Sequence, residues 1–186
     1  MPGAVKKAIE LQSQIANSFI PQQFENPANP SIHRVTTAPE ILQQTEGKLD
    51  VFVATAGTGG TITGTGEALK EHLPNLQVIV VEPKGSPVLS GGEPGPHKLV
   101  GTSPGFVPAI LNTDVYDEIV QVADEHAIQT TRDLARLEGI LVGPSAGAAV
   151  WTAIQKARVL GPGKRVLCIA PDNGERYLSM EGLFGE

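Results

Sequence analysis

The chain has 186 residues, which is enough for one well-packed domain or for one domain with part of a second. Its formal net charge is −6, and an acidic chain without a basic cluster argues against nucleic acid as a partner. It contains no apolar run of the roughly 18 residues that a membrane span needs and no secretory signal, so we expect a cytoplasmic protein. The single cysteine, Cys168, and the spacing of the four histidines predict neither a disulfide framework nor a metal site.

Helical spacing of apolar residues predicts a first helix over residues 2–18, followed by an extended segment over residues 19–24. The motif NPANP, residues 26–30, is rich in turn-forming residues and is the best candidate for a crossing between domains. From there on, strands and helices alternate, interrupted by a long Gly/Pro-rich loop over residues 83–108. We expect strands at residues 49–54, 77–82, 118–122, 140–142 and 165–170, and helices at residues 37–44, 61–72, 124–138 and 145–158, with a short helix after the last strand.

Two of the predicted helices begin with a sequence signal for an N-terminal cap. Thr37 to Glu40 matches a capping box, and Asp124 is expected to cap the helix that Gly139 ends. The alternation of strands and helices predicts an α/β fold with a mainly parallel, twisted sheet flanked by helices.

One loop between a predicted strand and a predicted helix is unusually rich in glycine and threonine: residues 54–64, ATAGTGGTITG. A loop that leaves the carboxyl end of a strand and opens a helix directs free backbone N–H groups and the positive end of the helix dipole toward one point. Glycine lets an anion approach the backbone, and threonine hydroxyls add donors. The functional interpretation is therefore a phosphate site; the structural alternative is a tight turn that only packs a helix on a strand.

Three kinds of phosphate loop compete for this interpretation. The P-loop fails because Gly60 is followed by Thr61 rather than by lysine. The dinucleotide motif G-x-G-x-x-G fails because Ile62 stands at its third glycine, although Glu82 ends the next strand where a ribose-binding acid would lie. The third possibility is the phosphate of pyridoxal 5′-phosphate (PLP).

Five motifs occur in chain order: QQFENPANP at 22–30, GTGGTITG at 57–64, PGPHKLVG at 94–101, GPSAGAA at 143–149 and GERYLS at 174–179. Together they resemble the PLP-dependent cysteine synthases (O-acetylserine sulfhydrylases) of fold type II, over nearly the whole chain. The resemblance implies that the chain corresponds to roughly the last three-fifths of such an enzyme. Residues 1–26 would be the tail of the smaller domain, and residues 27–186 the larger, cofactor-phosphate-binding α/β domain, incomplete at its N-terminus.

The resemblance also implies two sets of site residues. The cofactor-binding set is Gly57, Thr58, Gly59, Gly60 and Thr61 around the phosphate and Ser145 at the pyridine nitrogen; the substrate-binding set is Gln23, Gly101, Thr102 and Ser103. From the residues alone, Ser145 serves equally well as a helix cap and Gln23 as a polar surface residue. The chain has GTSPGF at 101–106 where the family pattern is close to GIGAGF, which leaves the substrate open.

The reaction implied is a β-replacement, in which sulfide displaces the acetate of O-acetylserine to give cysteine and PLP acts as the electron sink. The family's Schiff-base lysine belongs to an upstream segment resembling S-V-K-D-R, which this sequence does not contain. Lys98 is the only lysine in a matched loop, and we assign it no catalytic role. We therefore assign no catalytic residue, and we expect the chain alone to show no absorbance of lysine-bound PLP and to make no cysteine.

The family is usually homodimeric, and its active-site cleft binds the C-terminal tail of serine acetyltransferase, so both are implied partners. Three alternatives stay open. The motif GPSAG and the dipeptide Pro171–Asp172 also resemble cystathionine β-synthases, which condense serine with homocysteine. The chain could also be a non-catalytic, shortened paralogue that binds partners, or a dinucleotide domain that uses Glu82.

Overall fold

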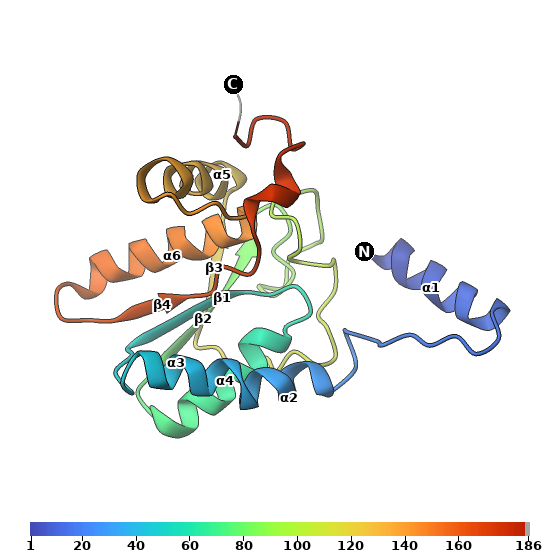
Figure 1. Cartoon of the computed structure of the whole chain (residues 1–186), viewed down its shortest axis with the longest axis horizontal. Helices are drawn as coiled ribbons and strands as arrows, with labels where there is room; N and C mark the ends of the chain where they lie inside the picture. Colours follow the sequence, from blue (N-terminus) through green and yellow to red (C-terminus); the bar gives the residue numbers. More distant parts are fainter. Residues whose placement is uncertain (185–186) are drawn as a thin grey trace.

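A parallel sheet with the strand order β3-β2-β1-β4 lies at the centre of the computed structural model, which describes residues 1–184 (Figure 1). The strands are β1 (Val51–Thr55), β2 (Gln77–Pro83), β3 (Glu118–Val122) and β4 (Val166–Cys168). In the parallel register, Phe52 of β1 lies opposite Val78 of β2 and Leu167 of β4. The predicted α/β fold with a parallel sheet is confirmed.

Helices cover both faces of the sheet (Figure 1). One face carries α2 (Ala28–Val35), α3 (Thr37–Gln44) and α4 (Gly60–His72), and the other carries α5 (Asp124–Asp133) and α6 (Pro144–Leu160). A π-helical turn, Leu134–Glu138, follows α5, and a 3-10 turn, Gly174–Tyr177, follows β4. Among residues 1–184, no helix has both the length and the apolar character needed to cross a bilayer.

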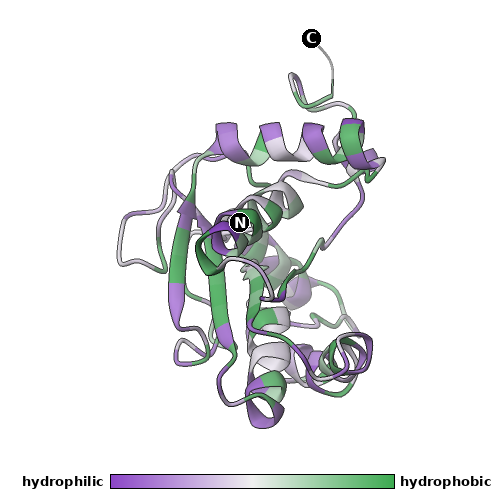
Figure 2. Ribbon diagram, turned by 90° about the vertical axis from the view of Figure 1, so that its left-hand side faces the viewer, coloured by the Kyte–Doolittle hydropathy of each residue, from purple (hydrophilic) through white to green (hydrophobic). Residues whose placement is uncertain are grey.

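The central strands are buried on both faces, because successive side chains of a strand point to opposite sides. Figure 2 shows these strands as predominantly hydrophobic. Side chains on one face pack with α3 and α4: Phe52, Ala54, Val78, Val80, Ala38, Ile41, Ile62 and Leu69. Side chains on the other face pack with α5 and α6: Val51, Val53, Ile79, Val81, Ala127, Ala148 and Ala153. This two-sided burial explains why β1 and β2 read as continuous apolar runs.

The first helix, α1 (Pro2–Gln14), ends four residues earlier than predicted and has no buried residue. It lies apart from the sheet, joined to α2 by a segment without helix or strand (Figure 1). Two of its large apolar side chains face solvent: Ile9 is 51% and Leu11 is 40% exposed. Without burial, helix length depends on weak intrinsic propensities, and the residues after Gln14 include β-branched and turn-forming types.

One helix after residue 26 was missed in the sequence, and one predicted capping box is not formed. α2 begins within NPANP at Ala28, where the Ala28 N–H donates to Asn26 Oδ1 at 3.0 Å, so only the first part of this motif lies outside a helix. The capping box at Thr37 is absent: Thr36 is the N-cap residue of α3, and no side chain caps the helix. The Thr37 hydroxyl instead lies 2.9 Å from His33 Nδ1, which competes for the same hydrogen bond.

Two predictions in the second half also need correction. Asp124 does not cap α5, whose N-cap residue is Ala123. Instead, the Asp124 carboxylate accepts a hydrogen bond from the Lys98 N–H at 3.0 Å and so holds the long loop of residues 83–108. The predicted strand at residues 140–142 is reduced to one isolated bridge between Val142 and Asn173. This bridge fixes the chain that enters α6 against the chain that leaves β4.

Candidate functional site

The topology of the sheet identifies one place for ligand binding, the edge formed by the carboxyl ends of its strands. The chain passes from β1 through β2 to β3 on one side and then returns to β4 on the other side of β1. In open α/β sheets, ligands bind outside the carboxyl ends of the strands where the strand order reverses in this way. The loop of residues 56–59 leaves β1 at this edge. The start of α6 lies at the same edge, because Val142 pairs with Asn173 just beyond β4.

A cavity of about 230 Å³ lies against this loop. It brings together two of the predicted cofactor residues and all four predicted substrate residues. Its described lining consists of Met1, Gln23, Phe24, Gly57, Thr58, His97, Gly101, Thr102, Ser103 and Pro104. The other four predicted cofactor residues do not line this cavity: Gly59, Gly60, Thr61 and Ser145. The structure therefore divides the predicted cofactor set and unites the predicted substrate set.

The wall of the cavity consists of two loops in close contact. A Cβ atom on Gly57 would overlap the carbonyl oxygen of Gly101, so a glycine is required where the loops meet. The Ser103 N–H donates to the Ala56 carbonyl at 3.0 Å. Ser103 has a left-handed φ of +42°, where glycine would be unstrained, and its hydroxyl lies 2.9 Å from the Ser86 carbonyl oxygen. These bonds hold Ser103 in the place where the family pattern has glycine.

Thr58 offers a hydrogen-bond donor at the cavity. Its Oγ1 accepts two hydrogen bonds, one from Asn29 Nδ2 at 3.0 Å and one from the Gly60 N–H at 3.3 Å. α4 begins directly after this loop, and its N-cap residue, Gly59, has a φ of +86° and provides no side-chain cap. The first N–H groups of a helix have no partner within it, and the helix dipole makes this end positive. The loop is therefore suited to an anion.

The remaining residues of the glycine motif have packing roles. A Cβ atom on Gly60 would overlap the Asn29 side chain, and one on Gly64 would overlap the Pro30 carbonyl, so both glycines let α2 pack closely on α4. The Thr61 hydroxyl lies 3.3 Å from Nε2 of His33. Burial lowers the pKa of His33, which favours a neutral imidazole between Thr61 and α3. Helix packing thus explains the second half of the motif, from Gly60 to Gly64, and anion binding explains the first half, from Gly57 to Gly59.

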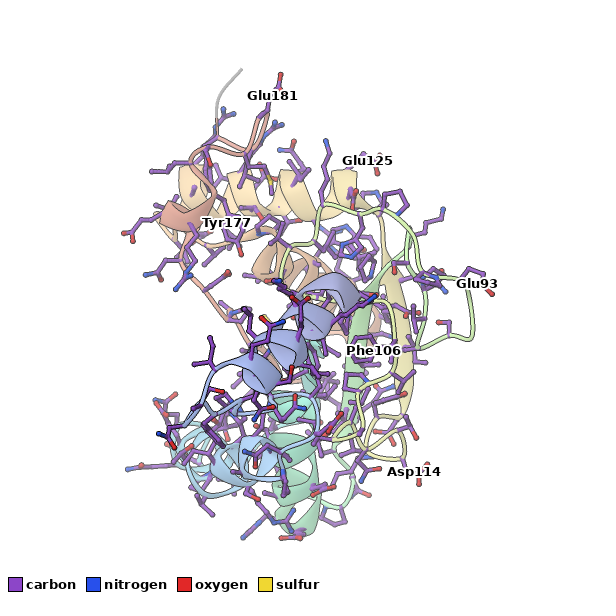
Figure 3. All side chains as sticks on the ribbon, turned by 90° about the vertical axis from the view of Figure 1, so that its right-hand side faces the viewer. Glu93, Phe106, Asp114, Glu125, Tyr177 and Glu181 are labelled. Carbon is purple, nitrogen blue, oxygen red and sulfur yellow. The ribbon has the colours of Figure 1, made fainter. Side chains whose placement is uncertain are left out.

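Ser145 is the second residue of α6 and is only 3% exposed. The start of this helix is fixed by Asp172, whose carbonyl accepts the Gly143 N–H at 3.3 Å and whose carboxylate accepts a hydrogen bond from the Tyr177 hydroxyl. Burial, and secondarily this bond to the Asp172 carboxylate, raises the pKa of Tyr177 to about 12. Tyr177, labelled in Figure 3, stands in the turn that follows β4.

Glu82 does not meet the expectation for a ribose-binding acid. It is 2% exposed, and its carboxylate accepts the N–H groups of Leu89 at 2.8 Å and Ser90 at 3.2 Å together with the Ser90 hydroxyl. These bonds occupy the carboxylate in folding the long loop back on β2. The geometry therefore argues against the dinucleotide alternative.

Sequence reasoning missed three residues at the cavity. Asn29 connects the Gln23 carbonyl, at 2.8 Å, to the Thr58 hydroxyl. Phe24 packs edge-to-face on Phe106, with ring centroids 5.1 Å apart. His97 contributes a buried Nδ1 atom that has no hydrogen-bond partner in the described protein. All three lie in matched motifs, Phe24 and Asn29 in QQFENPANP and His97 in PGPHKLVG, but neither motif assigns them a role.

Comparison with known proteins agrees with this geometry. The family model described as pyridoxal-phosphate dependent enzyme matches residues 1–172. A probable cysteine synthase of Bacillus subtilis is 65% identical over 184 residues, which are 97% of this chain and 59% of that protein. A cysteine synthase of Staphylococcus aureus is 56% identical over 180 residues, which are 96% of this chain and 58% of that protein.

Among solved structures, an O-acetylserine dependent cystathionine β-synthase from Helicobacter pylori superposes with a TM-score of 0.93 at 44% identity. The match covers 99% of this chain and 60% of that one. The chain thus spans about three-fifths of the length of the curated relatives that it matches. The chain belongs to the family of pyridoxal-phosphate-dependent enzymes and is a homologue of the cysteine synthases.

Proposed function

We propose that this chain provides the cofactor-phosphate and substrate-facing walls of a cysteine synthase, which replaces the acetate of O-acetylserine by sulfide and yields cysteine. The observation that carries the proposal is the cavity of about 230 Å³, in which Gly57 and Thr58 meet Gln23, Gly101, Thr102 and Ser103. In this proposal, residues 1–26 belong to a smaller domain and the residues from 27 onward to the larger domain. We place the protein in the cytoplasm, where the sequence alone led us to expect it.

The donor set fits PLP. The backbone N–H groups around Thr58, its hydroxyl and the positive end of α4 would hold the phosphate, and Ser145 would donate to or accept from the pyridine nitrogen at the start of α6. When bound, PLP supplies the electron sink for β-elimination and replacement. The neutral hydroxyl of Ser145 suits this chemistry, since it leaves the ring nitrogen less cationic than a carboxylate would.

The substrate side follows from the other residues of the cavity. Gln23 is exposed at the cavity wall, and its side-chain amide would donate to the carboxylate of the amino-acid substrate. The loop from Gly101 to Ser103 would orient the substrate through backbone groups, because it contacts the phosphate loop directly. No lysine lines the cavity among the described residues, so the group that captures the cofactor aldehyde would come from a segment outside this sequence.

Binding of vitamin B6 compounds to the purified chain tests the anion site. We expect pyridoxine 5′-phosphate to bind and pyridoxine, which lacks the phosphate, to bind at least about tenfold more weakly, since charge-assisted hydrogen bonds contribute about 1.5–3 kcal/mol each. Thr58→Val should weaken only the phosphate ester. Equal affinity for the two compounds would refute the phosphate site.

Activity measurements test the reaction. We expect this chain with PLP, O-acetylserine and sulfide to form no cysteine and to show no absorbance of lysine-bound cofactor. A version extended at its N-terminus with the corresponding residues of the Bacillus subtilis relative should gain both properties. Cysteine formation by the unextended chain would contradict the assignment of the lysine to another segment.

One alternative reaction has specific support. The superposed Helicobacter pylori enzyme is an O-acetylserine dependent cystathionine β-synthase, and in the sequence Pro171–Asp172 resembles that family. Offering the extended version sulfide and homocysteine in parallel separates the two reactions, since the alternative predicts faster turnover with homocysteine.

The partners of the family are also proposed here: a second copy of the chain, and the C-terminal tail of serine acetyltransferase. Sedimentation of the chain with and without a peptide of that tail tests both. Tail binding without any activity of the extended version would favour the non-catalytic paralogue.

A further inference from the structure

The side-chain amide of Asn29 uses both of its hydrogens at the cavity wall. Asn29 Nδ2 lies 2.8 Å from the carbonyl oxygen of Gln23 and 3.0 Å from Oγ1 of Thr58. A carbonyl oxygen can only accept, so the nitrogen and not Oδ1 must face Gln23. This fixes the orientation of the amide and makes Asn29 a donor to both partners.

The two bonds that Thr58 accepts determine where its own hydrogen points. A hydroxyl has two lone pairs and one hydrogen, and Asn29 Nδ2 and the Gly60 N–H occupy the two acceptor positions. The hydrogen of Thr58 is therefore left as a donor, on a residue that lines the cavity. Because both acceptor positions are occupied, the Thr58 hydroxyl can only donate to a ligand. It therefore favours a ligand group that only accepts, such as a phosphate ester.

Asn29 itself is held rigidly. α2 packs on α4 at glycine positions, where a Cβ atom on Gly60 would overlap the Asn29 side chain. The Asn29 N–H donates to the Asn26 carbonyl at 3.0 Å, which fixes the first turn of α2. Because both the backbone and the side chain of Asn29 are held, its amide can keep Gln23 and Thr58 at fixed positions.

We propose that Asn29 is a positioning residue that aligns the two halves of the site, an inference that rests on the proposed function. Through Thr58 it directs a donor toward the phosphate, and through the Gln23 carbonyl it holds the residue that faces the substrate carboxylate. Asn29 touches neither ligand group in this scheme, so its effect on the phosphate passes through the Thr58 hydroxyl.

A double-mutant cycle in the purified chain tests this route. The ligand is pyridoxine 5′-phosphate, which has no amino-acid carboxylate and so reports only the Thr58 branch; pyridoxine is the control ligand. We expect Asn29→Ala and Thr58→Val each to weaken binding by about tenfold, and Asn29→Ala to cost less than about twofold once Thr58→Val is present. Asn29→Asp, which keeps the volume but cannot donate to Thr58, should weaken binding at least as much as Asn29→Ala. Thermal unfolding and circular dichroism identify any variant that does not fold.

The outcomes distinguish a failure of the proposed function from a failure of the positioning role of Asn29. If the wild-type chain does not distinguish the phosphate ester from pyridoxine, the proposed function fails and Asn29 has no site to align. If the wild type binds and Thr58→Val weakens binding, but the effect of Asn29→Ala is absent or fully additive, the phosphate site stands and the positioning role of Asn29 is overturned. If Asn29→Ala weakens both ligands alike, its role is structural and the inference is likewise overturned.

Discussion

Replacing Gly59 by alanine perturbs the anion loop in a way that the structure makes calculable. Gly59 has a φ of +86°, and an added Cβ atom would lie 2.7 Å from Cβ of Leu111 and 2.8 Å from its Cδ1. Ordinary van der Waals contact begins at 3.4 Å, so either the segment at Gly59 or the segment at Leu111 must move away by about 0.7 Å. Because Gly59 is the N-cap residue of α4, the withdrawal displaces Thr58 and the N–H groups beside the cavity.

Two costs contribute to the destabilisation. A left-handed φ costs a residue with a Cβ atom about 1–2 kcal/mol, and overpacking costs about 1–3 kcal/mol more, so Gly59→Ala should lower the free energy of unfolding by about 2–5 kcal/mol. Gly163 is a matched control, since its φ is +85° and a Cβ atom added there would have no neighbour within 4 Å. Gly163→Ala should therefore show only the conformational cost, about 1–2 kcal/mol.

Urea unfolding of both variants measures the stability difference, and titration with pyridoxine 5′-phosphate measures the effect on the site. We expect Gly59→Ala to weaken binding of the ester and Gly163→Ala to leave it unchanged. Equal destabilisation by the two substitutions would show that Leu111 does not restrict the loop. A destabilised Gly59→Ala variant with full affinity for the ester would refute the placement of the phosphate at this turn.

Three other properties follow from the structure. Burial raises the pKa of Cys168 from 9.0 to about 11, so its thiol should react about 100-fold more slowly with an aromatic disulfide in the native chain than in urea. The raised pKa of Tyr177 gives a stabilisation that is complete below about pH 10 and lost as the pH rises to about 12; Tyr177→Phe should flatten that part of the pH dependence of unfolding. Glu82→Gln weakens the acceptor for the Leu89 N–H and should cost about 1–3 kcal/mol in urea unfolding, with faster proteolysis within residues 84–108.

The sequence predicted the sheet well and parts of its surroundings poorly. β3 was predicted with its observed bounds and β2 within one residue. For β2 the reason is that an apolar run that is buried on both faces has few other conformations open to it. α2 was missed because NPANP carries strong turn signals. Proline is tolerated in the first turn of a helix, and the packing of α2 on α4 through Gly60 and Gly64 is a tertiary effect that no local pattern reports.

The candidate site shows the same division. The loop motif indicated an anion site at the end of β1, and the family resemblance indicated Gln23, which lines the same cavity. Asn29 lies in the same matched motif as Gln23, but its role could not be read from the sequence, since its partners Gln23 and Thr58 lie 6 and 29 residues away. The double use of the glycine motif was also hidden, because glycines that admit a ligand and glycines that admit a neighbouring helix have the same local pattern.

The two sides of the cavity are held with unequal strength. The anion side belongs to the sheet and to α4, whose core residues, such as Phe52 and Ile62, are fully buried. Besides the hydrogen bonds of Asn26 to the Pro21 and Gln22 carbonyls, three contacts fix the side that carries Gln23: the Asn29 amide at the Gln23 carbonyl, the Ile110 N–H at the Phe24 carbonyl at 3.3 Å, and the Phe24–Phe106 pair.

Each of these contacts is worth about 1 kcal/mol, and α1 adds no buried residue to them. The Gln23 side can therefore shift at a cost of a few kcal/mol while the anion side keeps its shape. It follows that a ligand held only by its phosphate reports the rigid half of the site. A ligand that also reaches Gln23 must in addition hold the weaker half in place, and its affinity will depend on the three contacts that fix it.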